Sequence, residues 1–245
     1  MSQLKICDIH NHILYGVDDG SKTMEQSNRM LGIAYEEGIR AIILTPHYNK
    51  RIWKPDMAVW QERYQQLKQL AHENYPDLKI FLGGEIFYNS GTLEDLEEGR
   101  VPTMAGGRYV LMEFDTNVSS QRLTHAVMEI IQNAYIPIVA HVERYECVLK
   151  DIDLIYELKE LGAYIQVNVS GVMGTHGKLE KKCTKKLLKQ GLVDFIATDA
   201  HRDDKRTPHI KDCVNHVVKK YGEGYAQRIF YYHPACVITN KEIEE

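Results

Sequence analysis

Seven short apolar stretches recur along the chain, and each is nearly continuous in hydrophobicity. They are rich in β-branched residues, a composition typical of a strand that is buried on both faces. The stretches are residues 4–9, 41–45, 79–82, 109–114, 136–140, 164–169 and 194–198. We therefore predict seven short buried strands.

Amphipathic patterns at helical spacing separate most of the predicted strands. Thr23 and Gln26 have the spacing of a capping box, and Gly38 is placed to end the helix that follows. Further helices are predicted from apolar residues three or four positions apart. These residues are Trp60, Tyr64, Leu67 and Ala71; Leu123, Val127, Ile130 and Ala134; and Ile155 and Leu158, followed by Gly162.

Strands that alternate with helices in this way form parallel β-α-β units. We predict an α/β fold, a distorted (β/α)7-type barrel, with an open doubly wound sheet as the second choice. The sequence contains no linker, low-complexity stretch or convincing internal repeat, so we expect one domain over residues 1–245. In a barrel, the chemically active residues lie at the C-terminal ends of the strands.

The composition is that of a soluble globular protein. Hydrophobic residues make up 44% and charged residues 26% of the 245 residues, and the net charge is −4. This charge disfavours a nucleic-acid partner, and no apolar run approaches the roughly 20 residues of a membrane span. Residues 1–5 lack the apolar stretch of a signal peptide. We expect neither nucleic-acid binding nor membrane insertion.

The five cysteines are widely scattered and form no CxxC pair. They are Cys7, Cys147, Cys183, Cys213 and Cys236. This pattern argues against a disulfide framework or a structural zinc site and favours a reducing compartment. We therefore expect a cytoplasmic protein whose cysteines are structural.

Acidic residues and histidines follow six of the seven predicted strands. The segments are Asp8-Ile9-His10-Asn11-His12, Pro46-His47, Gly84-Glu85, Glu113-Phe114-Asp115, His141-Val142-Glu143-Arg144 and Asp199-Ala200-His201. Residues two apart in a strand face the same side, so His10 and His12 converge on one point. Asp8 lies in line behind them and is placed to orient an imidazole.

At one barrel mouth these segments provide about nine nitrogen and oxygen ligands. One metal ion takes roughly four to six ligands, so the set predicts two or three divalent ions. Donors without thiolates favour Mn, Fe, Zn or Mg. Taken alone, His47 or His141 is more simply interpreted as an ordinary core or surface residue. Several buried carboxylates and imidazoles would be costly without cations, however, and this favours the metal site.

The ordered set of motifs resembles the PHP superfamily (polymerase and histidinol phosphatase) along essentially the whole chain. Its motifs here are Asp8-x-His10-x-His12, Thr45-Pro46-His47, Gly84-Glu85, His141 and Asp199-Ala200-His201. Residues 8–20, 45–49, 99–114, 140–145 and 198–201 are similar to the CpsB/YwqE branch. That branch consists of bacterial manganese-dependent protein-tyrosine phosphatases linked to capsule or exopolysaccharide synthesis. The resemblance implies a PHP-type barrel and hydrolysis of phosphotyrosine, with a bacterial tyrosine kinase as protein partner.

The resemblance also implies a three-metal arrangement, with Mn²⁺ as the expected ion. The implied ligands are His10, His12, Glu85 and Asp199 for the first ion; Glu85, Glu113 and His141 for the second; and Asp19, His47 and His201 for the third. Asp18 is a rival to Asp19, and Asp115 and Glu143 are left as supporting or surface residues. Arg144 and Arg206 are the candidate catalytic residues, because guanidinium binds phosphate in a bidentate manner. The alternative for each arginine is a surface salt bridge.

The expected chemistry is attack by metal-bound hydroxide on a phosphate monoester, because cations lower the pKa of water and offset phosphoryl charge. A phenolate leaving group, with a pKa near 10, needs little acid assistance. Cysteine-dependent tyrosine phosphatases carry an arginine six residues after the nucleophile. The corresponding positions here are Ile13, Asp153, Lys189, Lys219 and Glu242. The alternatives are a small-molecule phosphomonoesterase such as histidinol phosphatase, a nuclease-like phosphodiesterase, and a metal-stabilised binding module.

Two further patterns have both an ordinary and a functional interpretation. Six lysines crowd residues 178–189 and form either a solvated helix face or a surface that attracts an acidic or phosphorylated partner. Tyr48, Trp53 and Tyr88 follow ligand-bearing strands. They either wall a pocket for an aromatic ring or pack in the core.

Overall fold

The computed structural model describes residues 5–53 and 55–244. Leu4 of the first predicted strand, and residues 1–4 of the segment inspected for a signal peptide, lie outside the described residues. The seven predicted strands are β1 Ile6–Asp8, β2 Ile39–Leu44, β4 Lys79–Leu82, β6 Tyr109–Glu113, β7 Ile136–Val139, β8 Tyr164–Asn168 and β9 Phe195–Ala197. Two very short strands, β3 His47–Tyr48 and β5 Glu85–Phe87, were not predicted.

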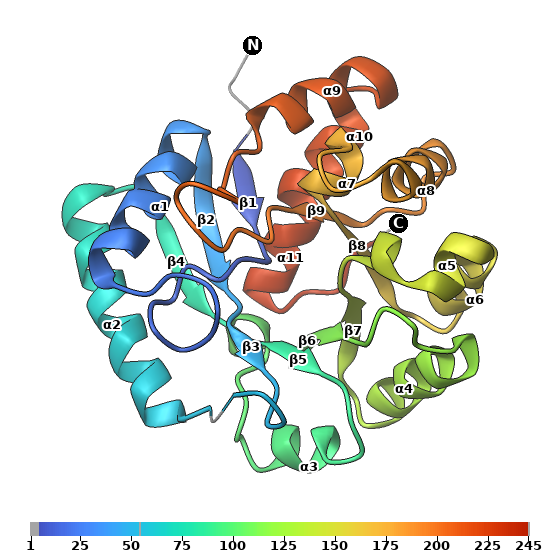
Figure 1. Cartoon of the computed structure of the whole chain (residues 1–245), viewed down its shortest axis with the longest axis horizontal. Coiled ribbons are helices and arrows are strands. Elements are labelled where there is room, and N and C mark those ends of the chain that lie inside the picture. Colours follow the sequence, from blue (N-terminus) through green and yellow to red (C-terminus); the bar gives the residue numbers. More distant parts are fainter. Residues whose placement is uncertain (1–4, 54, 245) are drawn as a thin grey trace.

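The helices lie mainly outside the strands, as Figure 1 shows. Their bounds are α1 Met24–Glu36, α2 Met57–Asn74, α3 Thr92–Glu97, α4 Ser120–Gln132, α5 Glu146–Lys150, α6 Leu154–Glu160, α7 Val169–Met173, α8 Lys178–Lys189, α9 Lys211–Tyr221, α10 Glu223–Gln227 and α11 His233–Thr239. Short irregular helical turns are η1 Met104–Gly106, η2 Val142–Arg144 and η3 Arg228–Tyr232.

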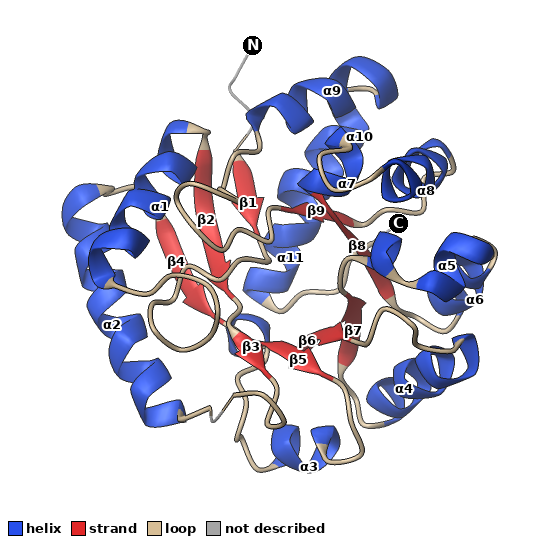
Figure 2. Cartoon of the chain, viewed as in Figure 1, coloured by secondary structure: helices blue, strands red, loops and turns tan. Residues whose placement is uncertain are grey.

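The strands form two parallel sheets that curl around a common centre (Figure 2). One sheet has the order β1-β2-β4 and the other β3-β5-β6-β7-β8-β9. The connections between neighbouring strands carry the helices, as expected of β-α-β units. The predicted distorted barrel is confirmed, and the alternative of an open doubly wound sheet is wrong.

The two sheets meet where proline and glycine interrupt the strands. Pro46 separates β2 from β3, and Gly83 and Gly84 separate β4 from β5. The ladder nevertheless continues, because Gly83 N donates to Leu44 O (2.8 Å) and Glu85 N donates to Pro46 O (3.0 Å). A Cβ on Gly83 would lie 3.0 Å from Ile43 Cγ2 and 3.1 Å from Met104 Sδ, so a side chain would crowd the interior. These breaks turn His47 and Glu85 toward the barrel mouth.

Asp8 joins the first strand to the segment after the last strand. Its buried carboxylate accepts from Thr198 N (3.0 Å) and from Thr198 Oγ1 (2.6 Å). Beyond it, Asp199 N donates to His10 O (2.8 Å) and His12 N donates to Ala200 O (2.7 Å). The expectation that Asp8 orients an imidazole is therefore wrong. Its carboxylate is used to close the barrel, because the unpaired edges of β1 and β9 meet there.

Apolar side chains fill the barrel below the site. Ile9, Ile43, Leu111, Ile138 and Phe195 belong to one inner cluster and are each at most 1% exposed. Most of the remaining apolar residues form a larger cluster between the strands and the surrounding helices. The inner cluster thus forms an apolar floor beneath the polar side chains at the C-terminal end of the barrel.

The helix boundaries follow the predicted signals closely. Thr23 caps α1 by accepting from Gln26 N (3.2 Å), and α1 ends before Gly38, which has φ +94°. Gly162, with φ +104°, follows α6. Ala134 is an exception, because α4 ends at Gln132 and Ala134 lies beyond it with φ +64°.

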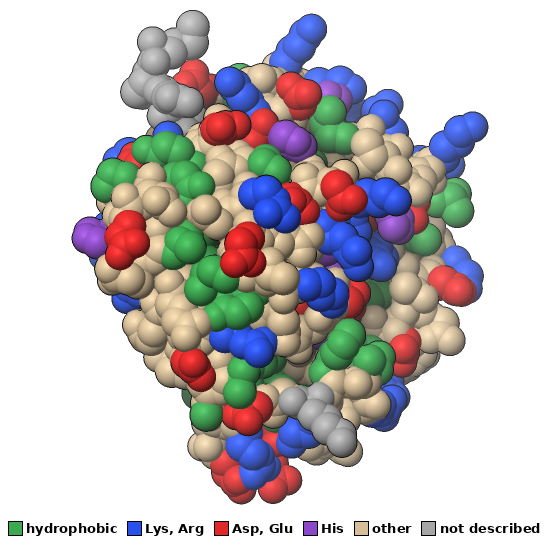
Figure 3. Space-filling view, turned by 60° about the vertical axis from the view of Figure 1, so that its left-hand side comes forward, with side chains coloured by type: hydrophobic (Ala, Val, Ile, Leu, Met, Phe, Trp, Pro, Cys, Tyr) green, Lys and Arg blue, Asp and Glu red, His purple; other side chains and the backbone are tan. Residues whose placement is uncertain are grey.

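The surface carries mixed charge. On the face in Figure 3, lysine and arginine side chains are scattered among acidic ones. The six lysines of α8 are exposed, while Cys183, Thr184, Leu187 and Leu188 of the same helix are buried, so these lysines form a solvated face. None of the described helices has both the length and the apolar character needed to cross a membrane. All five cysteines are free thiols.

Replacement of Asp8 by alanine is expected to destabilise the fold by about 2–4 kcal/mol, because it leaves the buried N–H and hydroxyl of Thr198 without an acceptor. The measurement is chemical denaturation followed by circular dichroism, with chelator in every sample. Asp77→Ala is the control, because Asp77 is an exposed carboxylate paired with Arg40, and it should change the midpoint little. Equal midpoints for the two variants would contradict the role of Asp8 in closing the barrel.

Candidate functional site

The nine side chains predicted as metal ligands lie together at the C-terminal end of the barrel. Each has a nitrogen or oxygen atom within 4 Å of an oppositely charged partner in the same set. They are His10, His12, Asp19, His47, Glu85, Glu113, His141, Asp199 and His201. They come from the ends of strands far apart in sequence, as expected when parallel strands close into a barrel.

Glu85 lies at the centre of this cluster and is 1% exposed. Its Oε1 lies 3.1 Å from His10 Nε2 and 2.9 Å from His141 Nε2. Its Oε2 lies 3.3 Å from His12 Nε2 and 2.9 Å from His47 Nδ1. One carboxylate thus faces four imidazoles, a geometry suited to bridging two cations.

Three overlapping groups of donors lie close enough to hold an ion, with ligand atoms within 4.8 Å of one another. The groups are His10, His12 and Glu85; His47, Glu85 and Glu113; and His12, Asp19, His47 and His201. They overlap the three ligand sets that the resemblance implies but do not coincide with them: His12 also joins the third group, His47 also joins the second, and Asp199 and His141 lie outside all three.

The two remaining predicted ligands lie beside these groups. Asp199 Oδ1 is 3.7 Å from His10 Nε2 and 3.4 Å from His12 Nε2. His141 Nε2 is 3.6 Å from Glu113 Oε1, in addition to its contact with Glu85. The structure therefore brings all nine side chains together.

Several atoms that face the cluster are buried and have no hydrogen-bond partner. They are His10 Nε2, His12 Nε2, Asp19 Oδ1 and Glu85 Oε2. A buried polar atom without a partner is costly unless something else satisfies it. Imidazole nitrogens and carboxylate oxygens are the donors that divalent Mn, Fe and Zn accept. The residues present therefore fit divalent metal ions.

Two of the histidines direct Nδ1 to an acceptor that is not one of the inward-facing groups. His12 Nδ1 lies 2.7 Å from Asp18 Oδ2, and His201 Nδ1 lies 3.0 Å from the carbonyl oxygen of Asp199. Because both partners are acceptors, each neutral ring carries its proton on Nδ1 and presents the Nε2 lone pair inward.

This arrangement bears on the choice between Asp18 and Asp19. The Asp18 carboxylate also accepts from Gly20 N (2.9 Å) and His47 N (2.9 Å), so it is fully used in orienting the loop. Asp19 Oδ1, by contrast, lies 3.5 Å from His47 Nε2 and 3.6 Å from His201 Nε2. The geometry favours Asp19 as the ligand. Gly20 is required beside it, because a Cβ there would lie 2.2 Å from His12 O.

The backbone is strained at two of the predicted ligand positions. His141 has φ +33° and Asp199 has φ +49°, values that favour glycine. Such conformations cost roughly 1–3 kcal/mol each and persist only where the surroundings impose them. Here they turn the two side chains from the ends of β7 and β9 toward the cluster.

Mutual attraction between imidazoles and carboxylates shifts the pKa values of the cluster. Burial opposes charge on Glu85, but the positive charges of His10 and His47 hold its pKa well below the usual range. Burial also opposes charge on His47 and His141, but neighbouring carboxylates raise their pKa values to about 10 and about 9. Burial and the charge of His12 lower the pKa of His201 to about 2.

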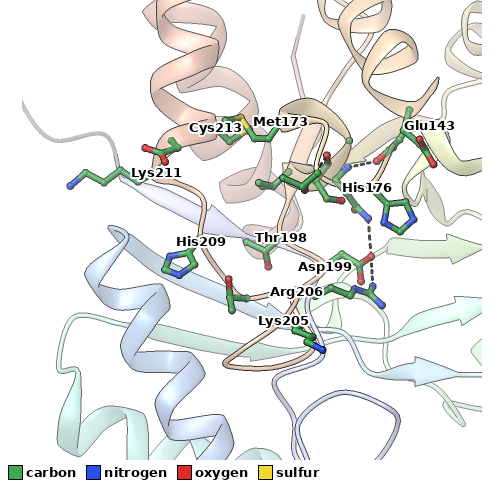
Figure 4. A pocket seen from close by; sticks show the side chains of 18 of the residues that line it. Glu143, Met173, His176, Thr198, Asp199, Lys205, Arg206, His209, Lys211 and Cys213 are labelled. Carbon is green, nitrogen blue, oxygen red and sulfur yellow. Dashed lines mark hydrogen bonds and ion pairs between the residues drawn. The ribbon is translucent and has the colours of Figure 1, made fainter. Parts of the chain in front are cut away.

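Both predicted arginines lie at the edge of the cluster, against Asp199. Arg206 Nη2 donates to Asp199 Oδ2 (2.7 Å; Figure 4). Arg144 Nη1 lies 3.7 Å from the same oxygen. Arg144 is 30% and Arg206 46% exposed, so their remaining donors are open to a ligand. The two arginines are not isolated surface salt bridges, because their shared partner, Asp199, is a buried residue of the cluster.

A cavity of about 600 Å³ is lined by both arginines. Figure 4 shows Arg206 and other residues of its lining. Asn168, Asp199, Arg144 and Arg206 line the end nearest the cluster, and the segments after β8 and β9 supply much of the remaining lining. Its size falls within the range of small-molecule sites, roughly 300–1,000 Å³.

The aromatic residues considered for the pocket wall do not line this cavity. Tyr48 and Tyr88 are 3% and 6% exposed and belong to the large apolar cluster, so the core interpretation is correct for both. Cys213 does line the cavity, but burial raises its thiol pKa to about 12, which argues against a thiolate nucleophile.

The two carboxylates left outside the ligand set differ in environment. Asp115 is exposed. Glu143 is buried and accepts from Asn168 N (2.8 Å). Gln166, whose Oε1 lies 3.0 Å from His10 Nδ1, was not among the predicted site residues. The only signal for it is its position two residues before Asn168 at the end of the sixth predicted strand.

Comparison with known proteins gives a consistent picture. The sequence model of the family described as "Capsular polysaccharide synthesis, CpsB/CapC" matches residues 6–239. The tyrosine-protein phosphatase CpsB of Streptococcus pneumoniae is 33% identical over 241 residues, which are 96% of this chain and 99% of that protein. The tyrosine-protein phosphatase YwqE of Bacillus subtilis (strain 168) is 32% identical over 216 residues, 88% of this chain and 85% of that protein.

A solved structure agrees with the whole fold. It belongs to work described as "Crystal structures of YwqE from Bacillus subtilis and CpsB from Streptococcus pneumoniae, unique metal-dependent tyrosine phosphatases". The two structures superpose with a TM-score of 0.90 at 28% identity, over 98% of this chain and 96% of that chain. The similarity therefore includes all strands that carry the cluster.

Metal binding is expected to release protons and to strengthen as the pH rises from about 6.5 to about 8.5. The reason is that His47 and His141, with pKa values of about 10 and about 9, hold protons in the metal-free protein that a metal ion must displace. Calorimetric titration with Mn²⁺ or Zn²⁺ in buffers of different ionisation enthalpy counts these protons.

His47→Ala should release fewer protons than the parent protein, whereas His72→Ala, at an exposed histidine of α2, should not differ from it. Binding that is independent of pH over this range would contradict the assignment of these imidazoles as ligands.

Proposed function

Because the chain belongs to the CpsB/CapC family of capsular polysaccharide synthesis proteins, we propose that it is a metal-dependent protein-tyrosine phosphatase. The resemblance to the CpsB/YwqE branch is thereby confirmed. The observation that carries the proposal is the cluster of nine buried or half-buried donors, bordered by two arginines and an adjoining cavity. These are the parts that hydrolysis of a phosphate monoester requires.

We propose that the nine side chains hold two or three divalent ions, with Mn²⁺ as the expected metal. Glu85 would bridge two of the ions, because each of its oxygens faces a different pair of imidazoles. Bound divalent ions would make a nucleophilic water available at neutral pH and would offset charge on the phosphoryl oxygens.

The protein's own residues would bind and orient the phosphate. Arg206 commits one donor to Asp199 and retains the others, while Arg144 lies farther from Asp199 and is free to form paired hydrogen bonds to phosphoryl oxygens. The phenol ring would extend into the cavity, where Val169 and Met173 provide apolar surface. A phenolate leaves readily, so the residues around it need not supply an acid.

We further propose that the substrate is a tyrosine-phosphorylated protein, with a bacterial tyrosine kinase of capsule or exopolysaccharide synthesis as the partner. The names and family description of the relatives support this context. A cytoplasmic location would suit both the kinase partner and the five free thiols. We also propose that the chain acts as one phosphatase domain.

Phosphate release should depend on metal and select phosphotyrosine. Protein stripped by chelator and reloaded separately with Mn²⁺, Zn²⁺ or Mg²⁺ should be most active with Mn²⁺. A phosphotyrosyl peptide should be hydrolysed faster than a phosphoseryl peptide of the same sequence or histidinol phosphate. His47→Ala should abolish this activity, and His72→Ala should retain it.

Activity that survives both chelation and His47→Ala would overturn the metal-dependent assignment. Metal-dependent hydrolysis of histidinol phosphate alone would retain the centre but replace the substrate, as expected of a small-molecule phosphomonoesterase.

Replacement of Arg144 by alanine should lower kcat/KM for the phosphotyrosyl peptide roughly 10- to 100-fold, the contribution of a charge-assisted hydrogen-bonded pair. Arg144→Lys should restore only part of this loss, because an ammonium group cannot form the bidentate contact. Arg108→Ala, at an exposed arginine paired with Glu242, is the matched control. Metal content should be equal in all three variants. Unchanged kinetics for Arg144→Ala would remove this residue from phosphate binding.

A further inference from the structure

Strand β8 differs from the other strands that lead to the site, because it ends in amides where they end in imidazoles or carboxylates. Gln166 and Asn168 lie two residues apart and therefore face the same side of the strand. Both are buried, at 0% and 3% exposure. Side-chain amides in such a place must have their donors and acceptors matched, because an unmatched buried amide is costly.

The orientation of the Gln166 amide follows from a backbone group. His141 N, which can only donate, lies 2.8 Å from Gln166 Oε1, so the oxygen must occupy this position. Gln166 Nε2 then points the other way and donates to Asn168 Oδ1 (2.8 Å). Asn168 Nδ2 in turn donates to Asp199 Oδ2 (2.8 Å). Donor and acceptor are thus assigned for every hydrogen bond from His141 N through the two amides to the Asp199 carboxylate.

This direction determines which nitrogen of His10 carries the proton. His10 Nδ1 lies 3.0 Å from the same Gln166 Oε1. Since that atom is an acceptor, a neutral His10 ring must carry its hydrogen on Nδ1. The lone pair then lies on Nε2, the buried atom without a hydrogen-bond partner that faces Glu85 and Asp199.

The other end of the chain of amides determines the orientation of Asp199. Its Oδ2 accepts from Asn168 Nδ2 and from Arg206 Nη2, both at short distance. Its Oδ1 is left on the side of the cluster, 3.4 Å from His12 Nε2 and 3.5 Å from His201 Nδ1. The backbone N of Asn168 is in turn held by Glu143 Oε1, which fixes the end of β8.

We infer that Gln166 and Asn168 form an amide relay that sets the tautomer of His10 and the orientation of Asp199 before any ion binds. The two residues are positioning residues, since neither places a charged group in the cluster. The role of the relay in orienting metal ligands rests on the proposed function, but its hydrogen bonds are present in the metal-free protein. It therefore predicts a property that does not require phosphatase activity.

The tautomer of His10 can be measured directly in the metal-free protein. We expect ¹⁵N NMR of histidine-labelled, chelator-treated protein, titrated to a pH at which the His10 ring is neutral, to show the proton of that neutral ring on Nδ1 and not on Nε2. Gln166→Met should shift His10 toward the Nε2-protonated form that free histidine prefers. Gln190→Met, at an exposed glutamine that follows α8, should leave the spectrum unchanged. A neutral His10 ring in the parent protein that carries its proton on Nε2 and not on Nδ1 would overturn the relay.

A second variant separates the two ends of the relay. Gln166→Glu retains an acceptor for His10 Nδ1 and His141 N but cannot donate to Asn168 Oδ1. We expect it to preserve the His10 tautomer and to weaken binding of Zn²⁺ or Mn²⁺, measured against a chromophoric chelator, as Asn168→Ala does. The expected loss for each is roughly 10- to 100-fold, the range for residues that orient metal ligands.

Gln190→Met should bind metal as the parent protein does. Parent-like metal affinity in Gln166→Met, Gln166→Glu and Asn168→Ala would overturn the proposed role. The expected NMR and metal-binding results without phosphotyrosine hydrolysis would retain the relay and reject the phosphatase assignment. Phosphotyrosine hydrolysis without the expected NMR and metal-binding results would reject only the relay.

Discussion

The buried carboxylate of Glu85 is the group around which the rest of the site is arranged. Four imidazoles, two after β1, one in β3 and one after β7, approach its two oxygens at 2.9–3.3 Å. A charge in this position is tolerable only with strong compensation, because desolvation of an ion costs several kcal/mol. In the metal-free protein, positively charged histidines supply that compensation. Divalent ions would supply it in the loaded protein.

The architecture of the barrel follows from the need to bring these groups to one end. The glycine pair before Glu85 and the proline before His47 interrupt two strands at the level where the two sheets meet. Asp8 closes the remaining gap through Thr198, so that His10, His12 and the segment after β9 lie side by side. The carboxylate of Asp8 thus holds the strands in place, while the carboxylate of Glu85 faces the imidazoles of the cluster.

A common rule governs the orientation of His10, His12 and His201. Each turns Nδ1 toward an acceptor outside the cluster and Nε2 toward its centre, although the acceptors differ: an amide oxygen, a carboxylate and a backbone carbonyl. The outer acceptor determines the tautomer, and the tautomer determines whether a lone pair is available inside. In the proposed metal centre, the residues that accept from Nδ1 would therefore be needed to orient the ligands.

The sequence by itself determined the seven main strands, the barrel and the set of side chains at its mouth, because these depend on local patterns and on the rule that parallel strands bring their C-terminal ends together. It could not separate Asp18 from Asp19, place Tyr48 in the core, or reveal the role of Gln166. Those outcomes depend on contacts between distant segments, such as Gln166 with His10 and Asp8 with Thr198. Adjacent residues with the same chemistry are distinguished only by which partners the tertiary structure places within hydrogen-bonding distance.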